Sequence, residues 1–154
     1  CDNIPAFRVG VIPCPVATVG FATNNKKGGV MTIAYWCVFI MVLLPLPFTG
    51  IAKGSRKGFD NSRPRAWLNE LDGRGARANW AQQNTFEAMP GFIGAVIIAH
   101  LAGAPQFWVD LLAVNFIVLR IFYGYLYVAD MPKLRSLCWS LAFFCVLGLF
   151  VVSA

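Results

Sequence analysis

The chain has 154 residues, of which 58% are hydrophobic and only 13% charged, and its formal net charge is +6 at pH 7. Its mean hydropathy of +0.62 is far from that of an average soluble domain and predicts an integral membrane protein in contact with lipid. The length predicts a single domain and excludes a separate soluble catalytic module beside the membrane helices.

Residues 1–30 are an N-terminal extension to which the sequence assigns no function. Its short apolar stretch is interrupted by Pro13 and Pro15 and is too short to span a bilayer. It also lacks the order of a signal peptide, in which a basic region precedes the apolar one. The leading Cys1 leaves a lipid-modified terminus open, but an incidental or processed extension before Met31 is the expectation.

Residues 31–154 are predicted to form an all-α, integral membrane four-helix bundle. The predicted helices cover about residues 31–52, 76–102, 106–129 and 134–153. Pro45 and Pro47 should kink the first helix near its end, because each removes a backbone donor and crowds the preceding turn. The polar loop that follows is expected to hold a short helix at about 65–71.

Positive charge is concentrated in the loop between the first two helices. Seven of the thirteen Lys and Arg residues lie between residues 53 and 77, as basic residues do in cytoplasmic loops. Lys133 and Arg135 are predicted to lie on the same side, so that both chain ends face away from the cytoplasm. No basic stripe interleaved with aromatic residues is present, and nucleic-acid binding is therefore not expected.

Two stripes of polar residues cross the predicted bundle. On the second helix, spacings of seven and three residues place on one face Arg77, Asn84 and Glu87. On the third helix, similar spacings group Arg120, Tyr123 and Tyr127. The pattern predicts one shared polar pocket that opens to the cytoplasmic side.

The charged members of these stripes need partners or water, because an ionised side chain at the bilayer centre costs about 2.5–3.5 kcal/mol. A purely structural interpretation stays open beside the pocket. In that interpretation Arg120 pairs with Glu87 or Asp110 and only fixes the helix register.

Metal and hydrolase chemistry are not expected. His100 is the only histidine and is placed near the far membrane surface, and the five cysteines show no C-x-x-C spacing. Ser136 has no histidine near it in sequence, so it does not resemble the nucleophile of a hydrolase.

The run from Arg77 to Pro90 resembles the MAPEG superfamily, the membrane-associated proteins of eicosanoid and glutathione metabolism. Members carry R-A, then N-x-x-E and a following proline on their second helix, which are matched here by Arg77-Ala78, Asn84-x-x-Glu87 and Pro90. Three further stretches are similar to family elements: Arg120-x-x-Tyr123-x-x-x-Tyr127, Arg135-Ser136, and, in the bacterial branch, Phe59-Asp60-Asn61 with Pro64-Arg65. The resemblance covers about Met31 to Ala154.

The resemblance implies a homotrimer in a membrane, the inner membrane for a bacterial member, with glutathione as co-substrate bound between neighbouring subunits near the cytoplasmic face. It implies that Asn84 and Glu87 hold the polar backbone of the tripeptide and that Glu87 meets its amino group. Arg135, with Ser136 beside it, would be catalytic. A cation there favours the thiolate, because a free thiol has a pKa of about 8.5.

The resemblance also implies that Tyr123 and Tyr127 line the pocket. Arg77 and Arg120, which belong to the two polar stripes, are predicted to take part in holding the co-substrate.

Two positions depart from the family pattern. Trp80 stands where well-studied glutathione-using members have a further Arg, four residues before the Asn, so one carboxylate clamp for glutathione is missing. Trp139 stands where some relatives have a tyrosine.

The implied function is a glutathione-dependent transferase or peroxidase that acts on hydrophobic electrophiles or lipid hydroperoxides. The alternative is a non-catalytic membrane scaffold or an accessory subunit of a larger membrane complex, which Trp80 and the small size favour. A small transporter is a third, less favoured possibility, because four helices without an evident internal repeat offer little basis for alternating access.

Overall fold

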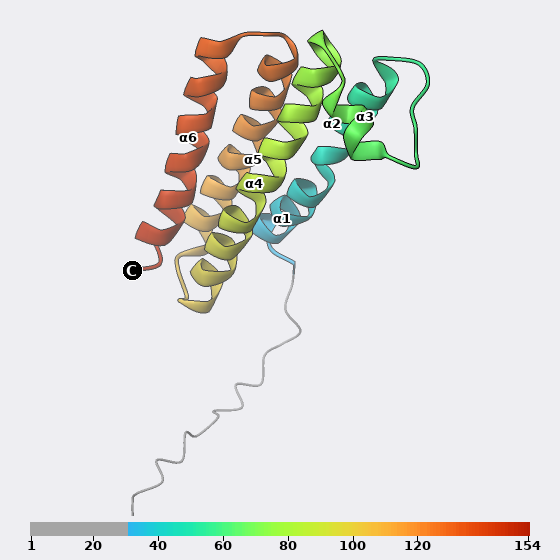
Figure 1. The fold of residues 1–154 in the computed structure, drawn as a ribbon. Helices are drawn as coiled ribbons and strands as arrows, with labels where there is room; N and C mark the ends of the chain where they lie inside the picture. Colours follow the sequence, from blue (N-terminus) through green and yellow to red (C-terminus); the bar gives the residue numbers. More distant parts are fainter. Residues whose placement is uncertain (1–30) are drawn as a thin grey trace, which may run out of the picture.

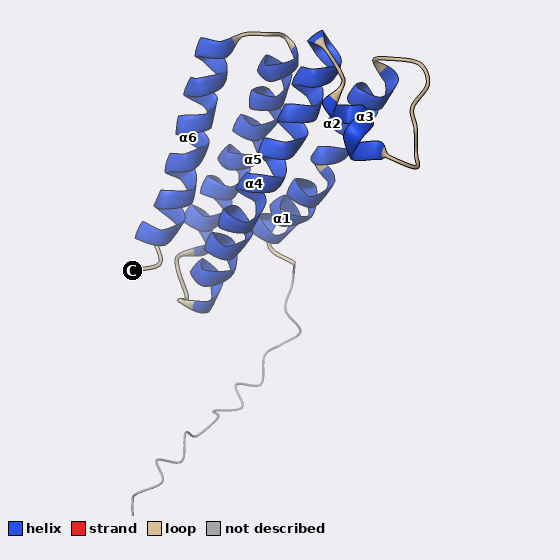
Figure 2. Cartoon of the chain, in the orientation of Figure 1, coloured by secondary structure: helices blue, strands red, loops and turns tan. Residues whose placement is uncertain are grey.

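The computed structural model describes residues 31–154, which form a bundle of helices without any strand (Figures 1 and 2). The helices are α1 (Ile33–Leu43), α2 (Pro45–Gly54), α3 (Pro64–Asn69), α4 (Gly73–Leu101), α5 (Gln106–Val128) and α6 (Pro132–Val151). The predicted all-α class is confirmed for this part of the chain. The predicted N-terminal extension, residues 1–30, lies outside the described residues.

The first apolar segment is bent between α1 and α2, where the sequence predicts a kink. Leu44 keeps a right-handed helical backbone, with φ −58° and ψ −31°, and its N–H still donates to the carbonyl of Ile40 at 2.9 Å. Pro45 then provides no N–H and its ring crowds the preceding turn, so the regular helix is interrupted there. Pro47 is tolerated because it lies in the first turn of α2, where the N–H groups have no intrahelical acceptor.

Three helical segments within residues 31–154 are long and apolar enough to cross a membrane: Ile33–Gly54, Gln106–Val128 and Pro132–Val151, with hydropathies of 1.9, 1.8 and 2.0. Together with the composition, they make the chain an integral membrane protein. The fourth long helix, α4, has 29 residues and is about 43 Å long at 1.5 Å per residue. Because its first half is polar, α4 is less apolar than the other three segments, and its crossing of the membrane stays a prediction.

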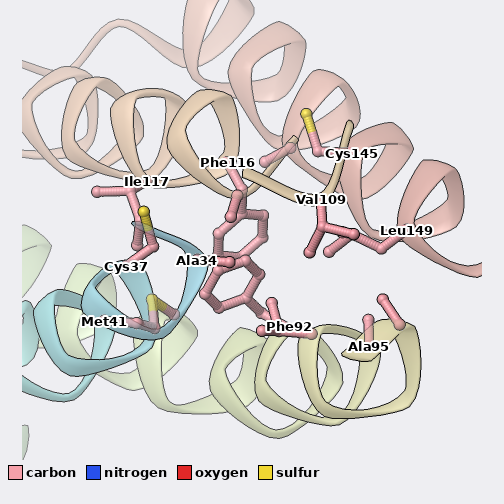
Figure 3. Packing of buried hydrophobic residues seen from close by; sticks show 14 residues of the cluster. Ala34, Cys37, Met41, Phe92, Ala95, Val109, Phe116, Ile117, Cys145 and Leu149 are labelled. Atoms are coloured by element: carbon pink, nitrogen blue, oxygen red, sulfur yellow. The ribbon is translucent and has the colours of Figure 1, made fainter. Parts of the chain in front are cut away.

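The apolar core lies where α1, α4, α5 and α6 meet (Figure 3). Phe92 of α4 stacks on Phe116 of α5, with ring centroids 4.1 Å apart and ring planes at 6°. Small residues of α1 and α4 pack around this pair and let the helices approach closely. The core therefore fixes the relative rotation of α4 and α5, the two helices that carry the predicted polar stripes.

The two ends of the bundle differ in charge. Ten Lys and Arg residues lie in residues 31–154, and all except Arg120 lie at the end that holds the α2–α4 connection and the α5–α6 turn (Figure 1). The α4–α5 turn and the C-terminus lie at the opposite end. There the Asp110 carboxylate accepts a hydrogen bond from the backbone N–H of Ala34 at 2.8 Å and so caps the start of α1.

Candidate functional site

Arg120 is the most deeply buried charged side chain of the described residues, with only 1% of its surface exposed. Its Nη1 donates to Oδ1 of Asn84 at 3.0 Å, and its Nη2 donates to Oγ1 of Thr85 at 3.4 Å. Its Nε has no hydrogen-bond partner. The guanidinium lies over the ring of Tyr123, 4.4 Å from the centroid. Neutral groups of α4 and an aromatic ring therefore hold this cation.

The ion pairs considered for Arg120 are not formed within residues 31–154. The Asp110 carboxylate accepts from Ala34 and from Gln106 at the far end of the bundle. Glu87 is linked to Arg120 only through Asn84, whose Nδ2 donates to Oε2 of Glu87 at 3.2 Å. Asn84 thus uses both ends of its amide, because the oxygen accepts from Arg120 while the nitrogen donates to Glu87.

A series of cation–aromatic contacts connects Arg120 with the basic end of the bundle. The rings of Tyr123 and Tyr127 meet edge to face, with centroids 5.6 Å apart. Arg135, in the first turn of α6, lies over the ring of Tyr127 at 4.2 Å from its centroid. Such contacts attract a cation to the face of a ring, so the two tyrosines connect a buried arginine with a peripheral one.

Two cavities flank this series, and they share Asn84 and Trp139 as walls. The first, here called the polar cavity, has a volume of about 220 Å³ and is lined by Asn84, Tyr123, Tyr127, Arg135, Ser136, Trp139 and Ser140. The second, the apolar cavity, has about 310 Å³ and is lined by Asn84, Glu87, Ala88, Gly91, Phe116, Arg120, Trp139, Ala142, Phe143 and Val146. A polar and a predominantly apolar ligand group can therefore lie side by side between α4, α5 and α6.

Seven of the eight residues predicted for the site line these two cavities; the eighth, Arg77, does not. Arg77 lies at the start of α4, where its Nη1 is 3.6 Å from the Asp130 carboxylate and its Nε donates to the Val128 carbonyl at 3.2 Å. Arg77 lies about 10 Å before Asn84 along the axis of α4, and Asp130 offers a carboxylate there. Arg77 thus ties α4 to the α5–α6 turn.

Ser136 lines the polar cavity, but its hydroxyl is engaged with its own helix. Its Oγ donates to the Pro132 carbonyl at 3.0 Å, and Ser140 makes the same bond to the Ser136 carbonyl at 3.0 Å. The oxygen of Ser136 keeps acceptor capacity toward the cavity.

The sequence predicted Arg135 and Ser136 of α6 for the site but did not assign the apolar part of the wall that α6 provides. Trp139 stacks on Phe143 with centroids 5.6 Å apart, and both line the apolar cavity. The available signal was the spacing of three and four residues that continues from Ser136 through Trp139 and Phe143 to Val146. In an apolar helix this spacing is masked, because lipid-facing positions are apolar too.

Trp80 is outside both cavities. Half of its surface is exposed, and its ring lies 6.5 Å from that of Tyr127, measured between centroids. The position at which the family resemblance leads one to expect an arginine therefore presents an indole next to a tyrosine of the polar cavity.

An apolar helical bundle with a buried arginine and a polar cavity at its basic end is typical of an integral membrane protein with a candidate ligand site among its helices. The sequence profile of the MAPEG family matches residues 33–154, and the chain belongs to this family. The resemblance seen in the sequence is thereby confirmed, and with it a membrane protein of the kind found in glutathione and eicosanoid metabolism. No curated protein and no solved structure matches the chain.

Proposed function

We propose that this protein is a glutathione-dependent transferase or peroxidase that acts on hydrophobic electrophiles or lipid hydroperoxides. The observation that carries the proposal is the pair of cavities that share Asn84 and Trp139. A polar thiol tripeptide suits the polar cavity, and an apolar second substrate suits the neighbouring one. Members of the MAPEG family generally use glutathione, which agrees with this division.

Each polar group has a role that its contacts support. Arg135 provides the cation that favours the thiolate over the thiol. Glu87 provides a carboxylate for the amino group of the tripeptide, and Asn84 hydrogen-bonds to its backbone. Arg120 acts as a positioning residue, because its bond to Asn84 fixes the direction of that amide. Tyr127 helps to hold the Arg135 guanidinium, which lies 4.2 Å from the centroid of its ring.

The proposal includes a homotrimer of four-helix subunits. Glu87 is exposed in the single subunit although α4 carries it next to apolar residues, and a carboxylate at membrane depth requires a partner. The amino group of the co-substrate is one such partner. A neighbouring subunit that covers the cavities would separate Glu87 from the surrounding lipid. Glutathione then binds between subunits.

The basic end of the bundle is proposed to face the cytoplasm, in a bacterial cell the cytoplasmic side of the inner membrane. Nine of the ten Lys and Arg residues in residues 31–154 lie there, as the bias of cytoplasmic loops toward basic residues requires. The polar cavity opens beside Arg135 at this end. A water-soluble thiol thus enters from the cytoplasm, whereas apolar substrates reach the apolar cavity from the membrane.

Turnover by detergent-purified full-length protein tests the proposal. We expect glutathione-dependent conversion of a broad-spectrum aryl halide or of a lipid hydroperoxide. Asn84→Ala and Arg135→Ala should each lower the rate by about 10²-fold, the size of effect seen when a group that stabilises developing charge is removed. Lys133→Ala is the matched control, because Lys133 lies in the same turn of α6, is exposed and lines neither cavity.

A non-catalytic scaffold or accessory subunit is the second candidate, and the exposed Trp80 at the position of an expected arginine favours it. In that case the wild type shows no turnover of either substrate. The Asn84 and Arg135 variants would then alter the oligomeric mass in detergent, and no chemical rate would distinguish them from Lys133→Ala.

A further inference from the structure

A third cavity of about 550 Å³ lies between α2 and α5, and it is larger than either cavity of the proposed site. We call it the α2–α5 groove. Its walls include Phe48 and Pro47 of α2 together with Ile121 and Tyr125 of α5, and Arg74 borders it at the start of α4. Ile121 and Tyr125 lie on the face of α5 opposite to Arg120 and Tyr123, so the groove is separate from the candidate site.

The bend at Pro45 explains why this groove exists. Before the bend α1 packs against α5, whereas after it α2 packs mainly against α4. The segment thereby leaves the surface of α5 and opens a space beside it. The ring of Phe48 contacts Gly124, where a Cβ atom would collide with it, and so forms an apolar floor between the two helices.

Arg74 gives the groove one charged end. Its side chain is exposed, and it forms no ion pair in the part of the chain that the structure describes, whereas Arg56, Arg63 and Arg77 do. It lies in the first turn of α4, a 29-residue helix whose N-cap residue, Asp72, makes no side-chain capping bond. The Arg74 cation and the positive end of the helix dipole favour an anion here, beside the exposed carboxylate of Asp72.

We propose that the α2–α5 groove binds an anionic phospholipid of the leaflet that contacts the basic end. One acyl chain lies along the apolar walls, and the phosphate meets Arg74 and the first turn of α4. An apolar trough that ends at a single free cation matches an amphiphile with a negative head group. Exposed Tyr125, in the last turn of α5 at the basic end, adds an amphipathic ring of the kind that is enriched at membrane interfaces. The proposal is independent of the glutathione chemistry, because the two sites share no lining residue.

Native mass spectrometry of the full chain in detergent tests this site. The protein is titrated with phosphatidylglycerol and, in parallel, with phosphatidylcholine of the same acyl chains. We expect preferential retention of phosphatidylglycerol, which Arg74→Gln weakens about fivefold, the effect of one basic residue at an anionic membrane surface. Ile121→Trp, which narrows the groove without changing charge, should weaken retention of the lipid as well.

Arg65→Gln is the matched control, since Arg65 is exposed at the same end, on α3, but borders a different cavity. Equal retention of the two lipids, or an equal loss in the Arg65 and Arg74 variants, would overturn the proposal in favour of general surface attraction. Displacement of the lipid by glycerol phosphate at similar concentrations would instead show an anion site that does not recognise the acyl chain. That result would also overturn the assignment.

Discussion

Arg120 shows how a charged residue is accommodated inside an apolar bundle without a carboxylate beside it. Its hydrogen bonds go to the neutral side chains of Asn84 and Thr85, and its flat face rests on Tyr123. Neutral groups therefore stabilise the positive charge, but no negative charge in contact with the guanidinium neutralises it. Glu87 is reached through the Asn84 amide, which leaves the carboxylate facing the cavity. A site with an uncancelled cation and a nearby carboxylate is suited to a zwitterionic ligand such as a peptide.

Replacing Arg120 by leucine should destabilise the fold. The change leaves Oδ1 of Asn84 without its donor inside the bundle, and a lost hydrogen bond to a charged group costs about 1.5–3 kcal/mol. The apparent melting temperature in detergent should fall, whereas Arg65→Leu, an exposed control, should leave it nearly unchanged. If Arg120→Leu were as stable as the wild type or more stable, burying the charge would cost at least as much free energy as its hydrogen bonds contribute.

At the scale of helices, the bend at Pro45 and the contact of Phe48 with Gly124 decide which surfaces meet. Before the bend the first segment packs against α5, and after it the segment packs against α4. Because Gly124 has no side chain, the Phe48 ring can still pack against α5. The two features act together, because the ring of Phe48 remains in contact with α5 after the helix axis has left it. The α2–α5 groove is the space that results.

Gly124→Ala should destabilise the protein by about 1–3 kcal/mol, the cost of adding a methyl group to a packed contact. The added Cβ would collide with the Phe48 ring, so the ring or α2 must move. Gly94→Ala is the control, because a Cβ there meets nothing within 4 Å and alanine favours the helix. Thermal unfolding in detergent compares the two, and Phe48→Leu should relieve the Gly124 variant. Equal melting temperatures of the two alanine variants would contradict the packing described here.

The sequence predicts the helical class and the kink because both follow from local chemistry, namely apolar runs and proline. It also groups Asn84, Glu87, Arg120 and Tyr123, because helical spacing determines which side chains share a face. The place of Arg77 depends instead on Asp130, a residue of another helix end, which no local spacing contains. The apolar part of the α6 wall, with Trp139 and Phe143, was missed for a similar reason, since the rotation of α6 depends on its packing against α5.

At the scale of the whole molecule, the two proposed ligand sites lie on different faces of the bundle. The polar and apolar cavities lie between α4, α5 and α6, where a neighbouring subunit of the proposed trimer would cover them. The α2–α5 groove lies on the other side of α5 and is proposed to remain in contact with lipid. Both proposed sites have an arginine at the basic end of the bundle, since Arg135 borders the polar cavity and Arg74 borders the groove.

Thiolate formation on bound glutathione is best tested by the ultraviolet absorbance difference of the thiolate, recorded during a binding titration of the purified protein. We expect saturable binding with a thiolate signal at neutral pH, retained in Lys133→Ala and lost in Arg135→Ala, because the cation of Arg135 lowers the pKa of the bound thiol. A wild-type protein that binds no glutathione, or a thiolate signal that persists in Arg135→Ala, would contradict this expectation.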